Sequence, residues 1–201
     1  MAWHVGKSLN LKIEFKGEKM KRVLFLFGQL NDQDIEWLMD VGMKRHVNPG
    51  DVLIQEGRSI DNMFIVLDGS LSVLQGGADA LELARLGCGE IVGEMSFIDG
   101  RPPSATVKVI DESLVFGIPT SALAGKLRSD MGFSSRFHRA LALFLSYRLR
   151  GTVGRLGHGK AEPIDDDQLD DMDDELDSNL LDTVHLAGQR FSKLLQDLRS
   201  H

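Results

Sequence analysis

Between residues 44 and 119 the chain consists of short β-rich segments separated by turn signals, and this pattern restricts the fold more than any other feature. Most turns contain Pro-Gly, Asp-Gly or Gly-Gly steps, which end strands. Candidate strands cover residues 46–47, 52–54, 64–67, 71–74, 81–86, 105–110 and 113–118. Their spacing of roughly 8–12 residues leaves no room for the crossover helices of a parallel sheet. The sequence therefore predicts a sandwich or barrel.

After Pro119 the hydrophobic pattern changes to helical periodicity. Thr120 is a candidate N-cap for a short helix over residues 121–127, and a longer helix is predicted from about residue 130 to residue 156. One side of the longer helix carries a stripe of large apolar residues: Phe133, Phe137, Leu141, Phe144, Leu145, Leu149, Val153 and Leu156. Such a stripe can cover its own barrel or pair with a second copy. Its size favours pairing, which predicts a homodimer.

Four regions follow from these patterns. Residues 1–21 form an N-terminal extension, and residues 22–156 form the main domain, which opens with a helix capped at Asn31 or Asp32. Residues 157–178 are predicted to be an acidic linker, because ten acidic residues and one basic residue lie between 160 and 178. Residues 179–201 are predicted to form an amphipathic helix that needs a partner surface.

Charge and apolar content narrow the classes of protein. The net charge is −7, most of it in the acidic stretch, which argues against a broad basic surface for nucleic acid. The chain has neither an 18-residue apolar run nor a signal-like N-terminus, so we expect no membrane span and a cytoplasmic location. The single cysteine, Cys88, is interpreted as a small buried residue.

Several short motifs occur in a specific order within the strand-rich region. They are residues 49–51, 56–57, 64–69, 89–97 and 104–107, with glycines at 50, 57, 69, 89 and 93. This run resembles the cyclic nucleotide-binding domain family, which includes bacterial catabolite activator proteins and kinase regulatory subunits. The similarity covers roughly residues 22–156. It implies a mainly β fold with flanking helices: a double-stranded β-helix jelly roll with a long C-terminal dimerisation helix, here followed by the extra C-terminal amphipathic helix.

The resemblance also implies a ligand site. The cyclic phosphate would lie at the backbone N–H groups of a short helix over residues 95–98, where the helix dipole favours an anion. Glu94 would accept a hydrogen bond from the ribose 2′-hydroxyl, and Ser104 would donate to the phosphate. The ligand-binding residues implied in this way are Gly93, Glu94, Met95, Ser96, Arg101, Ser104 and Ala105.

One position departs from the family pattern. Pro103 occupies the place of the arginine that pairs with the cyclic phosphate. Arg101 lies two residues earlier, on the same face of an extended segment but about 7 Å away. Losing a charged hydrogen bond lowers affinity about ten- to a hundred-fold. A cyclic dinucleotide such as cyclic di-GMP is the alternative ligand, with Arg136 and Arg139 as further contacts; for either arginine alone, a solvated helix charge is the simpler interpretation.

The sequence bears on four classes of function. We expect a non-catalytic second-messenger receptor that binds cyclic AMP, cyclic GMP or cyclic di-GMP, uses no cofactor, and signals to a protein partner such as a transcription regulator. The alternative is a ligand-free domain that acts as a dimerisation and docking scaffold. Only 45 residues follow Leu156, with one predicted helix, so a helix-turn-helix and direct DNA reading are not expected. Scattered histidines and the lack of a nucleophile motif do not indicate an enzyme or a metal site.

Overall fold

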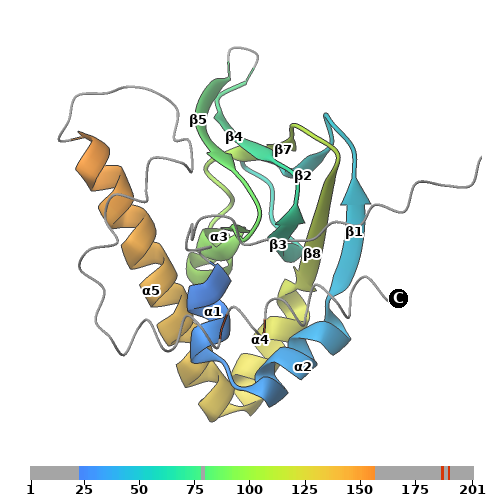
Figure 1. Cartoon of the computed structure of the whole chain (residues 1–201), viewed down its shortest axis with the longest axis vertical. Helices are drawn as coiled ribbons and strands as arrows, with labels where there is room; N and C mark the ends of the chain where they lie inside the picture. Colours follow the sequence, from blue (N-terminus) through green and yellow to red (C-terminus); the bar gives the residue numbers. More distant parts are fainter. Residues whose placement is uncertain (1–22, 78–79, 157–186, 188–189, 191–201) are drawn as a thin grey trace, which may run out of the picture.

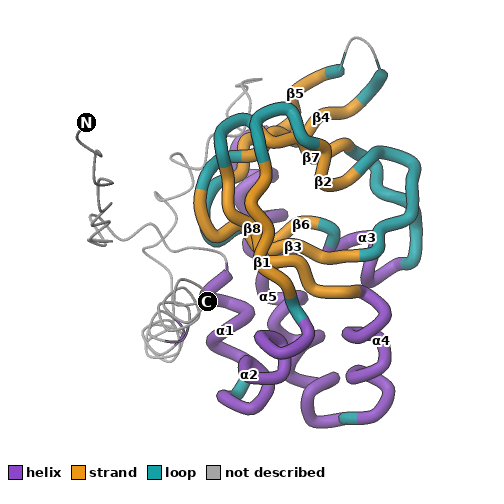
Figure 2. Tube along the Cα trace, turned by 90° about the vertical axis from the view of Figure 1, so that its right-hand side faces the viewer, coloured by secondary structure: helices purple, strands orange, loops and turns teal. Residues whose placement is uncertain are grey.

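The computed structural model describes residues 23–77, 80–156, 187 and 190. Two four-stranded antiparallel sheets, in the orders β1-β8-β3-β6 and β2-β7-β4-β5, form the predicted jelly roll (Figures 1 and 2). The strands are β1 (Met43–Val47), β2 (Val52–Ile54), β3 (Asn62–Asp68), β4 (Leu71–Gln75), β5 (Leu81–Leu86), β6 (Ile91–Val92), β7 (Thr106–Val109) and β8 (Ser113–Pro119). The sequence did not predict β6, which at two residues is too short to show a period.

The helices lie below and beside the barrel in Figure 1, where α2 and α4 are at the bottom and α5 runs up along the left side. They are α1 (Val23–Gln29), α2 (Asp32–Val41), α3 (Glu94–Asp99), α4 (Thr120–Ser129) and α5 (Met131–Leu156). The two helices predicted after Pro119 are confirmed as α4 and α5, and the helix capped at Asn31 is confirmed as α2. The sequence did not predict α1.

The cap of α4 differs from the prediction. Pro119 is the N-cap, and Thr120 is the first helical residue. The Thr120 hydroxyl donates to the backbone oxygen of Asp61 at 3.1 Å, so it joins α4 to the residue before β3 instead of capping the helix. A threonine hydroxyl bonds whichever acceptor the fold brings near, and here that acceptor lies outside the helix.

β3 is buried on both faces because it lies between two cores. Phe64 and Val66 contribute to the core inside the barrel, whereas Met63, Ile65 and Leu67 belong to the core between the sheet and the helices. Successive residues of a strand point to opposite faces, so one strand serves both cores.

The apolar stripe of α5 is buried in its first half and exposed in its second half. The part nearer its N-terminus is buried in the helical core and includes Phe133, Phe137, Leu141 and Phe144. Leu149 and Val153 beyond it are 63% and 58% exposed. The first half of the stripe therefore covers its own domain. The sequence had favoured pairing with a second copy over this use.

Three predicted regions lie outside the described residues: the extension 1–21, the acidic linker 157–178 and, apart from Ala187 and Arg190, the helix 179–201. Among the helices that are described, none is both long and apolar enough to cross a membrane.

Candidate functional site

The turn from β6 into α3 is built around Gly93. Its φ is +88°, a left-handed conformation that favours glycine. A Cβ atom at this position would also lie 3.1 Å from Cδ1 of Ile60 and 3.3 Å from Cδ1 of Ile54. Both the backbone and the available space therefore call for glycine here. The turn makes Glu94 the first residue of α3 and leaves Met95 exposed on the same turn.

Glu94 is a buried carboxylate held by the long helix. Its Oε1 lies 2.5 Å from Nη1 of Arg148 on α5, and Oε2 of Glu90 lies 3.7 Å from Nη2 of the same arginine. Both glutamates are 2% exposed. Burial raises the pKa of Glu94, and Arg148 opposes that rise without cancelling it. One guanidinium thus faces two buried carboxylates and joins α5 to the first residue of α3.

Sequence reasoning missed Arg148. It follows Phe144 by four residues, which places it on the buried side of α5, and its guanidinium carbon lies 5.3 Å from the centre of the Phe144 ring. An arginine at that spacing within an apolar stripe signals a buried partner, but only the fold shows that the partner is Glu94.

The loop after α3 holds the other implied residues. Arg101 is exposed, and its backbone N–H donates to Oδ1 of Asp99 at 2.9 Å. It is one of the residues that line a cavity of about 370 Å³ between this loop and the start of α4. Glu94 is not among the residues that line this cavity. Pro103 accepts a hydrogen bond from the Gly57 N–H at 2.9 Å, while Ser104 is exposed and Ala105 half-buried. This cavity therefore includes Arg101 but not Glu94.

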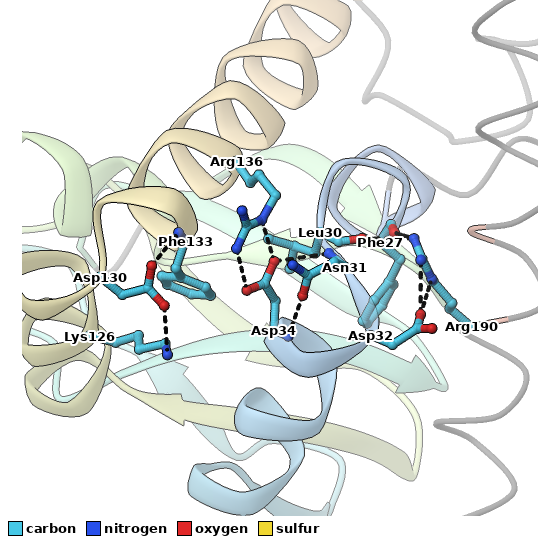
Figure 3. Close-up of polar contacts among 10 residues, drawn as sticks. All are labelled: Phe27, Leu30, Asn31, Asp32, Asp34, Lys126, Asp130, Phe133, Arg136 and Arg190. Atoms are coloured by element: carbon cyan, nitrogen blue, oxygen red, sulfur yellow. Dashed lines mark hydrogen bonds and ion pairs between the residues drawn. The ribbon is translucent and has the colours of Figure 1, made fainter.

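The two helix arginines lie elsewhere. Arg136 forms a bidentate pair with Asp34 of α2, with Nε–Oδ2 at 2.6 Å and Nη2–Oδ1 at 2.8 Å (Figure 3). Burial acts to raise the pKa of Asp34, but hydrogen bonds from Arg136 and the Asn31 N–H hold that pKa below its usual value. Arg139 is exposed. Arg136 therefore links α5 to α2 in this structure.

The arrangement brings together Gly93, Glu94, Met95 and Ser96 at the start of α3 and adds Arg148. Hydrogen-bond acceptors and backbone donors at one turn suit a small polar ligand that carries both hydroxyls and an anionic group. Within the described ranges, no group of three or more His, Cys, Asp or Glu residues is placed to hold a metal ion.

Comparison with known proteins points to the same part of the chain. The family described as cyclic nucleotide-binding domain matches residues 44–130. This part of the chain belongs to the cyclic nucleotide-binding domain family. The matched residues run from β1 to the end of α4 and include all of α3 and the loop after it.

Among relatives, the type II regulatory subunit of cAMP-dependent protein kinase of Drosophila melanogaster is 28% identical over 102 residues, 48% of this chain and 27% of that protein. The chain spans about a quarter or less of the curated relatives it matches. A cyclic nucleotide-binding domain from Methylobacillus flagellatus has a TM-score of 0.61 at 22% identity, covering 72% of this chain and 86% of that one. The Thermus thermophilus catabolite activator protein has a TM-score of 0.53 at 20% identity, covering 88% and 87%. These structural likenesses show the fold.

Proposed function

We propose that this chain is a non-catalytic receptor in which Glu94 and the first turn of α3 bind a cyclic nucleotide and α5 responds to it. The observation that carries the proposal is the contact between the buried Glu94 carboxylate and Arg148 of α5. The residue expected to accept the ribose hydroxyl is thereby in direct contact with the helix that would move. The family membership of residues 44–130 supports the ligand class.

A ligand would act by weakening the ion pair between Glu94 and Arg148. A ribose hydroxyl that donates to Glu94 changes how strongly the carboxylate holds the guanidinium, since both compete for the same oxygens. The ligand then favours one placement of α5 over another by the difference in its affinity for the two states. Glu90, 3.7 Å from the same arginine, provides an alternative carboxylate when Glu94 turns to the ligand.

The phosphate side of the site favours a cyclic mononucleotide, such as cyclic AMP or cyclic GMP, over a cyclic dinucleotide. Backbone N–H groups at Glu94–Ser96 and the Ser104 hydroxyl are the proposed phosphate donors, and Arg101 joins them if the loop of residues 99–103 turns inward. Cyclic di-GMP would additionally need Arg136 and Arg139. Arg136 is already paired with Asp34, so recruiting it would take the guanidinium away from a buried carboxylate.

We further propose that the receptor is a homodimer paired along the outer half of α5 and that it signals to a protein partner through the C-terminal region. The exposed Leu149 and Val153 support pairing, because large apolar side chains at four-residue spacing form helix–helix seams. Light scattering on the purified chain checks this part: a mass near twice 22.3 kDa supports it, and a single-chain mass removes it.

Thermal unfolding in the presence of cyclic AMP, cyclic GMP, cyclic di-GMP and cyclic di-AMP tests the receptor. A ligand at about 100 times its dissociation constant adds about 2.7 kcal/mol to the free energy of unfolding, so the midpoint should rise by about 5–11 °C. We expect a rise with cyclic AMP or cyclic GMP, lost in Glu94→Gln and kept in the exposed control Glu112→Gln. No rise with any compound would favour the alternative, a ligand-free docking scaffold.

Restoring the family arginine gives a second test. Pro103→Arg should tighten binding of the same nucleotide about tenfold or more, since a guanidinium at this place gains a charge-assisted bond to the phosphate. Isothermal titration measures the change. Pro102→Arg adds the same charge at the adjacent exposed residue and is the matched control. Equal gains for the two variants would show general charge attraction and would contradict a phosphate seated at residue 103.

A further inference from the structure

Two residues near the C-terminus contact the start of the domain. Ala187 is fully buried in the helical core. The Arg190 side chain is 17% exposed and forms contacts with α1 and α2 (Figure 3). These contacts cross about 160 residues of sequence. Residues 187 and 190 therefore lie against the α1–α2 corner. Both fall within residues 179–201, the predicted amphipathic helix that needs a partner surface.

The corner offers three acceptors to one guanidinium. Nη1 of Arg190 donates to the backbone oxygens of Phe27 at 3.1 Å and Leu30 at 2.7 Å, and Nε donates to Oδ1 of Asp32 at 2.9 Å. Phe27 lies in the last turn of α1, where the carbonyls carry the negative end of the helix dipole. The last turn of α1 contains no basic residue of its own, so Arg190 supplies the missing cation.

The same corner is held from its other side by α5. Asp32 and Asp34 both lie in the first turn of α2; Asp32 pairs with Arg190, and Asp34 pairs with Arg136 of α5 (Figure 3). In addition, α1 packs against α5. The first turn of α2 therefore lies between an arginine from the C-terminal segment and an arginine from the helix that carries Arg148.

We propose that the α1–α2 corner is the docking site for the C-terminal segment of the same chain, anchored by Arg190, and that this contact couples the segment to α5. An arginine fits because its planar fork reaches two carbonyls and a carboxylate at once, which a lysine ammonium does not. The docked segment stabilises α1 and the first turn of α2, and those elements contact the N-terminal half of α5. Docking and undocking of the segment thus bias the position of α5 whether or not a ligand is bound.

Thermal unfolding of the full chain tests the anchor. Arg190→Ala should lower the midpoint by about 3–8 °C, the usual effect of losing a charge-assisted set of bonds in a chain of this size. Arg190→Lys should recover less than half of that loss, and Arg199→Ala, a matched arginine nine residues further on, should leave the midpoint unchanged. The Arg190→Ala loss should stay the same over about a hundredfold range of protein concentration. Equal effects at 190 and 199, full recovery by lysine, or a loss that depends on concentration would overturn docking within one chain.

Amide hydrogen exchange tests the coupling. Arg190→Ala should speed exchange in α1, in the first turn of α2 and in α5 around Arg136, and should leave β4 unchanged. Faster exchange confined to α1 and α2 would overturn the coupling to α5. Both measurements are made without a nucleotide, so a negative result in the ligand screen leaves this proposal standing, and a negative result here leaves the receptor standing.

Discussion

Replacing Arg148 with alanine is expected to lower the free energy of unfolding by about 3–5 kcal/mol at neutral pH, the usual effect of removing one partner from a buried ion pair. The loss is large because two carboxylates, Glu94 and Glu90, are each 2% exposed and face this one guanidinium. Urea denaturation measures it. Arg150→Ala, an exposed arginine two residues further along α5, is the matched control and should change the free energy by less than about 0.5 kcal/mol.

The effect of Arg148→Ala should depend on pH with a definite sign. The pKa of Glu94 is already raised by burial, and without Arg148 it rises further. Between the ordinary glutamate value of about 4.3 and the raised value, the folded state holds a proton that the unfolded state lacks. Stability of the variant therefore falls as pH rises through that window. We expect a smaller loss near pH 5 than near pH 8, and a loss that is the same at both would show that Glu94 does not depend on Arg148.

Replacing Arg136 with alanine is the second large effect. Asp34 is 3% exposed and loses both of its bonds from the guanidinium, although it keeps the bond from the Asn31 N–H. About a third of the Arg136 side chain is exposed. We therefore expect a loss of about 2–3 kcal/mol, below the value for a fully buried pair. The thermal midpoint should fall by about 4–12 °C.

The stability that the Arg136–Asp34 pair contributes should depend on pH with the opposite sign. The pKa of Asp34 lies below its usual value, so the pair stabilises the fold above about pH 4 and this contribution is lost as pH falls through the lowered pKa. The loss of stability caused by Arg136→Ala should therefore be largest at neutral pH and should become smaller in acid. Arg139→Ala, an exposed arginine three residues on, is the control. Equal midpoints for Arg136→Ala and Arg139→Ala would contradict a structural role for Arg136 and return it to the candidates for ligand contact.

Much of the architecture could be predicted from local patterns. Turn glycines separate short strands, and Gly93 has the positive φ that its place in the motif implies. Asn31 and Asp34 form a capping box within four residues, so the start of α2 is decided by neighbours in the sequence. The first turn of α3 begins within one residue of its expected place. Each of these features depends on atoms a few bonds apart, which is why sequence reasoning reached them.

Other features depend on contacts between distant residues. The segment Val23–Gln29 is almost wholly apolar, so its own pattern does not separate strand from helix, and packing against α5 decides in favour of helix. Arg136 and Asp34 are 102 residues apart, and Arg148 and Glu94 are 54 residues apart.

By itself, the sequence determined the barrel, because backbone sterics and hydrophobic period act locally. Its ordered motifs carried the resemblance that implied the family and the glutamate at the start of α3. Only the tertiary structure decided which arginine meets which carboxylate. Several arginines on α5 look alike in sequence, and the choice among them depends on burial and on the direction in which each side chain leaves the helix. That choice ties Arg136 to α2, leaves Arg139 in solvent and gives Arg148 to the candidate ligand site.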